Sequence, residues 1–175
     1  MTGAYIWHLD DVLEQDQLPY DPLPPLRCFD ERPCCLIEDV GAILPMSPGK
    51  AKRDHDEYAK HGSCCVLLAC EPHTGFRYVD VRARRTAVDD ADFLKTLSAL
   101  HDPHAESIRL GQAKLNPHTP GAFSEVLSPE QAFELAKRCA PHDTPPQGSW
   151  LTMAESEFAA LSTQCLDRRI PAFDT

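Results

Sequence analysis

The chain has 175 residues, 42% of them hydrophobic, and a formal net charge of -10 at pH 7. This length suits one globular domain with its own core. The acidic balance argues against a free-standing nucleic-acid binder, because Lys and Arg supply most of the non-specific affinity for phosphate. The stretch from Met1 to Gln15 lacks the features of a signal peptide, and the longest apolar run, Cys64 to Cys70, is too short to span a bilayer. We therefore expect a cytoplasmic protein with no membrane contact.

The eight cysteines need an explanation of their own. Without a secretory signal they are expected to stay reduced. Neither Cys34/Cys35 nor Cys64/Cys65 forms a C-x-x-C motif, so the pattern favours buried small hydrophobic residues in strands. Zinc held by these cysteines and nearby histidines is the alternative reading.

The first part of the chain predicts a helix, a linker and three strands. Apolar residues between Tyr5 and Leu13 recur at helical spacing, and the prolines of residues 19–25 end that helix. Residues 1–25 are therefore read as a leading helix and a Pro-rich linker. Residues 26–30 form a short buried strand that ends in two acids, and the apolar runs 64–70 and 76–81 form a β-hairpin beside it.

The rest of the chain predicts helices alternating with strands. The polar and basic stretch from Pro45 to Gly62 reads as an exposed loop or ribbon. After the hairpin come, in order, a helix at 88–100, a strand at 107–112, a helix at 129–139, a short strand at 142–146 and a last helix from Thr152. This order favours an α/β fold, with a mixed sheet that carries helices on both faces, as in ribonuclease H-like proteins.

Phosphoryl transfer on DNA requires carboxylate side chains that bind metal ions, and these can be looked for in the sequence. Two divalent ions about 4 Å apart clamp the attacking and leaving oxygens, and such hard ions prefer oxygen ligands. The pattern to look for is one carboxylate at the end of a core strand, a second at the end of a neighbouring strand and a third on a packed helix.

Several motifs of this chain follow that pattern in order and spacing. Together they resemble the bacterial insertion-sequence DDE transposases related to the mariner superfamily, over about residues 5–173. The segments that carry the resemblance are Cys28–Pro33, Leu44–Gly49, Leu115–Pro120, Gly148–Glu157 and Gln164–Pro171.

The resemblance implies a catalytic domain over residues 26–175 with Asp30 as the first metal ligand and Glu155 as the third. It implies Mg²⁺ or Mn²⁺ as cofactor, strand cleavage and strand transfer as the reaction, and transposon ends and target DNA as partners. A homo-oligomer or an intact transposase is a further partner that it suggests. The helix-turn-helix region of the family is not found ahead of residue 26, so a truncated chain is expected.

The second ligand of the family is missing. The family has an Asp-Asn pair where this chain has Ala113-Lys114. Asn116 and His118, just beyond, are poor substitutes for a carboxylate on magnesium. We therefore expect metal affinity to collapse and the enzyme to be inactive, a degenerate transposase. The alternative is a non-catalytic regulator, or a remnant, that interacts with intact transposase.

Each candidate residue also has a purely structural interpretation. Asp30 could end a strand in a turn, and Glu31 should point to the opposite face of that strand. Glu155 could complete a capping box with Thr152 at the start of the last helix. Trp150 is expected to pack on the sheet as a core anchor, although stacking on a base is the other reading.

Overall fold

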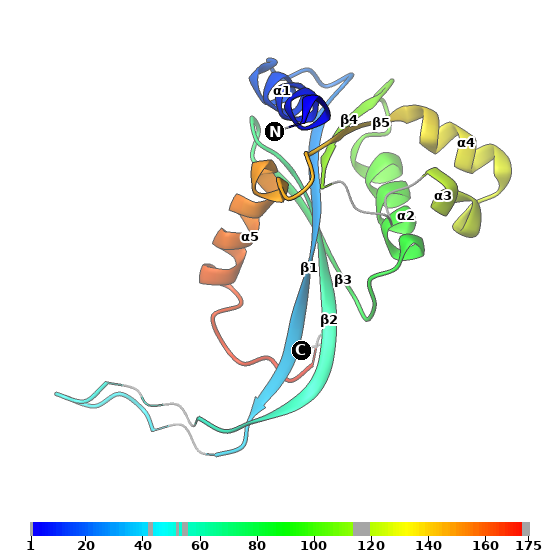
Figure 1. The fold of residues 1–175 in the computed structure, drawn as a ribbon. Coiled ribbons are helices and arrows are strands. Elements are labelled where there is room, and N and C mark those ends of the chain that lie inside the picture. Colours follow the sequence, from blue (N-terminus) through cyan, green and yellow to red (C-terminus); the bar gives the residue numbers. More distant parts are fainter. Residues whose placement is uncertain (1, 42–43, 52, 54–55, 114–119, 173–175) are drawn as a thin grey trace.

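A mixed five-stranded sheet with the strand order β3-β2-β1-β4-β5 forms the centre of the protein (Figure 1). The computed structural model describes residues 2–41, 44–51, 53, 56–113 and 120–172. Strand β1 pairs antiparallel with β2 and parallel with β4; β2 and β3 are antiparallel, and β4 and β5 are parallel. The strands are β1 (Leu26–Asp39), β2 (Tyr58–Glu71), β3 (Phe76–Arg82), β4 (Ile108–Gln112) and β5 (Cys139–Asp143).

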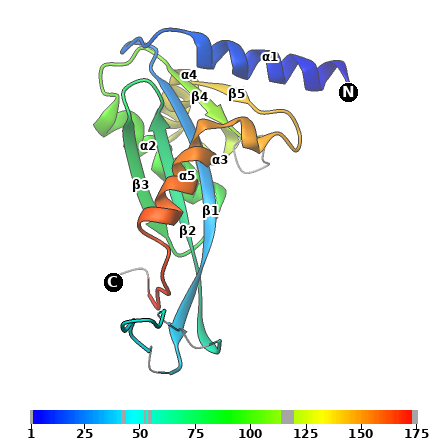
Figure 2. The same ribbon diagram turned by 90° about the vertical axis from the view of Figure 1, so that its left-hand side faces the viewer.

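Helices cover both faces of this sheet, as the sequence predicted. Helices α2, α3 and α4 lie against one face, α5 packs on the other, and α1 crosses beside β4 and β5 (Figures 1 and 2). The helical segments are α1 (Gly3–Gln17), α2 (Ala87–Thr96) with a π-helical turn (Leu97–His101), α3 (Pro120–Val126), α4 (Pro129–Arg138), a 3-10 turn (Ser149–Leu151) and α5 (Met153–Gln164). None of the described helices is long and apolar enough to cross a membrane.

The two faces of β1 contribute to two separate cores. Phe29 is fully buried and packs against Phe93 of α2, with the two rings tilted and their centroids 5.2 Å apart. Its neighbour Cys28 lies in the other core, together with Ala154 and Phe158 of α5. This is the two-residue alternation of a strand that has helices on both sides. It fixes which β1 side chains face α5.

Strand β1 is longer than predicted. The apolar pattern ended at Asp30, but β1 continues to Asp39, and β2 starts at Tyr58 rather than residue 64. Beyond Phe29, β4 no longer pairs with β1, so β2 is the one described strand beside this half of β1, and the Ile37 N–H on the other edge donates to the Ile170 carbonyl over 2.9 Å. Polar residues and Pro33 are tolerated there because one strand edge and much of the surface face solvent. The paired strands continue as a ribbon that projects from the body (Figure 1).

The remaining predictions are largely confirmed. The leading helix, the β2–β3 hairpin, α2, β4, α4 and α5 all lie where the sequence indicated. Strand β5 spans Cys139–Asp143, whereas we had expected residues 142–146. Pro141 explains the difference, since the residue before a proline avoids the helical region and α4 therefore ends at Arg138. Helix α3 was not predicted.

The cysteines are free thiols and serve mainly as core residues. Four of them are buried in strands, namely Cys28, Cys64, Cys65 and Cys70. Among the described residues, no group of three or more His, Cys, Asp or Glu side chains could hold a metal ion. The zinc alternative therefore gains no support from this part of the chain, although His55 lies outside it.

Candidate active site

Asp30 and Ala113 occupy matching places on two neighbouring parallel strands. Phe29 of β1 pairs with Gln112 of β4, and Asp30 and Ala113 are the next residues along the two strands. A Cβ atom on Gly111 would lie 3.6 Å from the Cys28 sulfur, so this side of β4 shares a face with Cys28. Alternation then puts Asp30 and position 113 on that same face.

Helix α5 packs over this face beside Asp30. Cys28, two residues before Asp30, belongs to the core formed with α5. Arg32, two residues after it, donates to the Ser162 hydroxyl over 2.7 Å and to the Phe158 carbonyl over 3.5 Å. Because these three β1 side chains point the same way, the Asp30 carboxyl group lies alongside the first half of α5.

Glu155 lies on the edge of α5 that is nearer to β4. Ala154 and Phe158 point into the sheet, and Glu157 forms an ion pair with Arg77 of β3 on one side of that stripe. At 100° per residue, Glu155 flanks the same stripe on the opposite side. Since β3 and β4 lie on opposite sides of β1 and β2, the Glu155 edge faces the β4 half of the sheet. The side chain is exposed.

Asp30 is held in a buried position. The residue is 7% exposed, and its Oδ1 accepts a hydrogen bond from the Glu31 backbone N–H over 2.9 Å. The Glu31 carboxylate forms an ion pair with Arg85, and it lies on the α2 side of β1. Glu31 therefore points away from Asp30, as the strand alternation predicted.

The expected capping box at the start of α5 is absent. The Thr152 side chain makes no cap hydrogen bond, and its buried hydroxyl has no hydrogen-bond partner among the described residues. The helix start is closed by the backbone, where the Glu155 N–H donates to the Thr152 carbonyl over 3.2 Å. The Thr152 side chain turns into the protein, which takes its oxygen away from the helix end. Glu155 is therefore free of the capping role that the sequence suggested.

The prediction for Trp150 was also wrong. Its side chain is 67% exposed rather than packed on the sheet. Trp150 lies in the 3-10 turn Ser149–Leu151, which follows a tight turn closed by the Gly148 N–H on the Pro145 carbonyl over 2.8 Å. A Cβ atom on Gly148 would lie 2.7 Å from the Pro145 ring, so glycine is needed for this approach. The turn directs Trp150 outward while it brings α5 to the sheet.

Comparison with known proteins shows the family of the chain. Residues 25–175 match the model of the DDE superfamily endonuclease family. The chain belongs to this family. No curated protein matches it.

Two solved structures share the fold of this DDE-family chain. A structure described as the Mos1 mariner paired end complex with Mn superposes with a TM-score of 0.55 and 11% identity, covering 95% of this chain and 49% of the other. A simian T-cell lymphotropic virus intasome in complex with the PP2A regulatory subunit B56 gamma gives a TM-score of 0.52 and 14% identity, covering 86% and 43%. This chain thus spans less than half the length of either protein. The predicted ribonuclease H-like fold is confirmed.

The described side chains of this DDE-family domain do not fit a two-metal centre. Asp30 and Glu155 offer carboxylate oxygens, but Ala113, which follows the end of β4 and is 5% exposed, offers only a methyl group. Two divalent ions need several oxygen ligands and enough negative charge to offset their own. Lys114, Asn116 and His118 lie outside the described residues.

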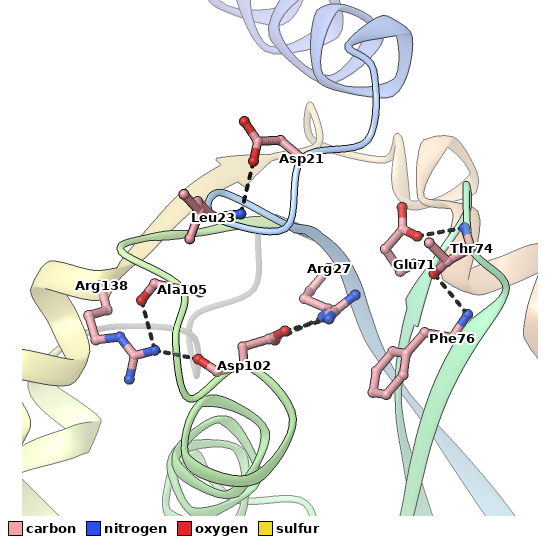
Figure 3. Close-up of polar contacts among 9 residues, drawn as sticks. All are labelled: Asp21, Leu23, Arg27, Glu71, Thr74, Phe76, Asp102, Ala105 and Arg138. Carbon is pink, nitrogen blue, oxygen red and sulfur yellow. Dashed lines mark hydrogen bonds and ion pairs between the residues drawn. The ribbon is translucent and has the colours of Figure 1, made fainter.

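A buried polar network anchors the strands that lead into this site (Figure 3). Arg27, at the start of β1, donates from Nε to Asp102 over 2.9 Å, and its guanidinium lies 4.3 Å from the centre of the Phe76 ring. Arg138 of α4 donates to the backbone carbonyls of Asp102 and Ala105 over 2.6 and 3.0 Å. The network joins β1 to the segment before β4. Nothing in the sequence singled it out, because Arg27 and Asp102 are 75 residues apart.

Proposed function

We propose that residues 26–175 are the catalytic domain of a DDE-type DNA transposase of the bacterial insertion-sequence kind related to mariner, and that Ala113 has inactivated it. The ancestral reaction is metal-dependent DNA strand cleavage and strand transfer. The observation that supports the proposal best is the strand register, in which Asp30 and Ala113 follow the paired residues Phe29 and Gln112. A carboxylate at position 113 would lie beside Asp30.

The balance between carboxylate and metal charge explains why the single change to Ala113 should be enough to prevent metal binding. In the ancestral site, divalent ions would supply the positive charge that stabilises the phosphoryl group in transfer. Asp30 and Glu155 would be the first and third ligands. Without a carboxylate at position 113 the site loses one oxygen ligand and one negative charge, and the next residue in the sequence, Lys114, is basic. Magnesium or manganese affinity should therefore be weak.

The proposed ancestral reaction also implies the partners of the domain. Transposon ends and target DNA are the substrates, and a second copy of the chain or an intact transposase is the protein partner. Action on bacterial DNA implies a cytoplasmic location. The net charge of -10 leaves this chain with weak attraction for a phosphate backbone.

A non-catalytic regulator is the second candidate. It is favoured by the two packed cores of the sheet, which are retained around a site that lacks one ligand. A regulator of this kind would bind intact transposase and would co-purify with it or inhibit it. A silent remnant would do neither.

Nicking of supercoiled DNA with Mg²⁺ or Mn²⁺ tests the catalytic proposal. We expect no nicking by the natural chain and metal-dependent nicking by Ala113→Asp, alone or with Lys114→Asn. Ala113→Asn is the matched control, since it has nearly the same shape without the charge, and it should stay inactive. Adding Asp30→Asn to the repaired protein should abolish nicking. Cutting by the natural chain would refute the inactivation, and silence of every repaired form would refute the assignment of the site.

A further inference from the structure

Two pairs of cysteines face each other across β1 and β2. Cys34 lies directly opposite Cys64, and Cys28 lies directly opposite Cys70. Directly opposite residues of an antiparallel pair have Cα atoms about 4.5 to 5.5 Å apart. Disulfides need Cα atoms about 4.4 to 6.8 Å apart. Both pairs therefore meet the backbone requirement for a bond.

The two pairs are equivalent in the ladder but differ in their surroundings. They lie an even number of residues apart along β1, so they occupy the same kind of ladder position and the same face. Cys28 and Cys70 are each 2% exposed, within the core covered by α5. This inner pair is closed to reagents in the folded protein.

The outer pair opens into a groove. A groove of about 570 Å³ is lined by Cys34 and Cys64 on the sheet side, with Cys165 and Ile170 on the opposite wall. Cys34 is partly exposed and Cys64 is buried. A small thiol reagent can thus reach the Cys34 sulfur, and Cys64 lies directly opposite it on β2.

We propose that Cys34 and Cys64 form a reversible, redox-active disulfide pair whose oxidant is a low-molecular-weight disulfide such as glutathione disulfide. The Cys34 thiolate attacks one sulfur of the oxidant, the oxidant's S–S bond breaks, and one glutathione leaves and takes up a proton. The Cys64 thiolate then attacks the Cys34 sulfur and releases the second glutathione. Two electrons pass from the cysteine pair to the oxidant, which is reduced to two thiols.

The chemistry of the pair fits a reversible bond. Burial raises the pKa of both the Cys34 and the Cys64 thiol, so little thiolate is present at neutral pH and oxidation is slow. Because Cys34 is partly exposed to the groove, a small thiol can reach a bond formed across the pair and reduce it by thiol–disulfide exchange.

The pair lies at the foot of the projecting ribbon. The register of β1 against β2 shifts between Leu36 and Ile37, just beyond Cys34. In this region β4 no longer pairs with β1, and the other edge of β1 meets the C-terminal segment, where the Ile37 N–H donates to the Ile170 carbonyl over 2.9 Å. A bond between Cys34 and Cys64 would therefore join the two strands just before the register shift, and it would slow the opening of the ribbon beyond it. The inference does not depend on the metal site.

The test treats the folded protein with glutathione disulfide and maps the disulfide-linked peptides by mass spectrometry. We expect a Cys34–Cys64 link, the loss of two of the eight thiols, full reversal by dithiothreitol, and slower backbone amide exchange in residues 36–39 and 58–62 of the oxidised form. Cys34→Ser should abolish the link, and Cys165→Ser should leave it intact.

Three results would overturn the proposal. The first is a link from Cys34 to Cys165, or no link at all. The second is oxidation of Cys28 and Cys70 as fast as the outer pair in folded protein, which would remove the argument from access. The third is unchanged amide exchange in the ribbon after the Cys34–Cys64 bond has formed, which would refute its effect on the strands.

Discussion

Arg27 and Asp102 form a buried ion pair that joins the start of β1 to the segment ahead of β4. The Arg27 and Asp102 side chains are 7% and 5% exposed, and the Nε to Oδ2 distance is 2.9 Å. Strands β1 and β4 run from this ion pair toward Asp30 and Ala113, which lie at their neighbouring positions on one face of the sheet. The pair therefore helps to set the position of these strands, although neither of its residues belongs to the candidate site.

Removal of Asp102 should destabilise the protein strongly. Asp102→Ala leaves the Arg27 guanidinium buried without its carboxylate, a change that costs about 3 to 5 kcal/mol in comparable pairs. The free energy of unfolding, measured with urea, should fall by that amount. Glu38→Gln, at the exposed His61–Glu38 contact, is the control and should cost less than about 1 kcal/mol. Equal losses in the two variants would contradict this role of the buried pair.

Glu71 should make stability depend on acid pH. Burial acts to raise the pKa of its carboxyl group, but hydrogen bonds from Thr74 and the His73 backbone outweigh burial and lower the pKa below the ordinary 4.5. The unfolded chain therefore binds the proton more tightly than the folded one. The stabilisation is fully present above pH 4.5 and is lost as the pH falls through the lower, folded value.

Glu71→Gln tests this dependence. At pH 7 the variant should be less stable by about 1.5 to 3 kcal/mol, the usual worth of hydrogen bonds to a charged group. As the pH falls below 4.5, the stabilities of the two proteins should converge. Chemical denaturation over a series of pH values measures both. A stability difference that stays constant down to the lowest pH would refute the lowered pKa.

Restoring a carboxylate at position 113 should make stability depend on metal. Ala113→Asp puts a second buried carboxylate beside Asp30, so without metal the variant should melt below the natural chain. Mn²⁺ should raise its melting temperature, since a ligand at 100 times its Kd stabilises by about 2.7 kcal/mol, and each kcal/mol corresponds to about 2 to 4 °C at this chain length. The natural chain and Ala113→Asn should show no such shift. Equal shifts in all three would count against a metal site at this position.

Two threonines at helix starts should respond in opposite ways. The Thr86 hydroxyl accepts from the Asp89 N–H over 3.2 Å, and the Asp89 carboxylate accepts from the Thr86 N–H over 3.0 Å. Thr86→Ala should therefore cost about 1 kcal/mol. The Thr152 hydroxyl caps nothing, so Thr152→Val, which removes a buried hydroxyl of similar shape, should be neutral or stabilising. Thermal melting of both variants checks this, and a clear loss for Thr152→Val would mean that its hydroxyl has a partner after all.

Local pattern in the sequence determined the class of the fold and most of its elements. The apolar spacing of residues 88–100 and the apolar run 64–70 predicted α2 and the core of β2, because helix and strand periods can be read from neighbouring residues. The alternation along β1 likewise predicted that Asp30 and Glu31 would point to opposite faces. The motifs around Asp30 and Glu155 indicated the family.

Tertiary structure alone decided what depends on contacts between distant segments. The register of β1 against β4 put Ala113 beside Asp30, and no local pattern encodes a pairing between strands so far apart in sequence. The length of β1 beyond Pro33 depended on its pairing with β2, which continues to Asp39. The exposure of Trp150 and the inward turn of Thr152 depended on how the Gly148 turn meets Pro145. These features depend on the free energy of the whole folded chain. The conformation with the best combined burial and hydrogen bonding is the most stable one, even where it goes against the local preference of a segment.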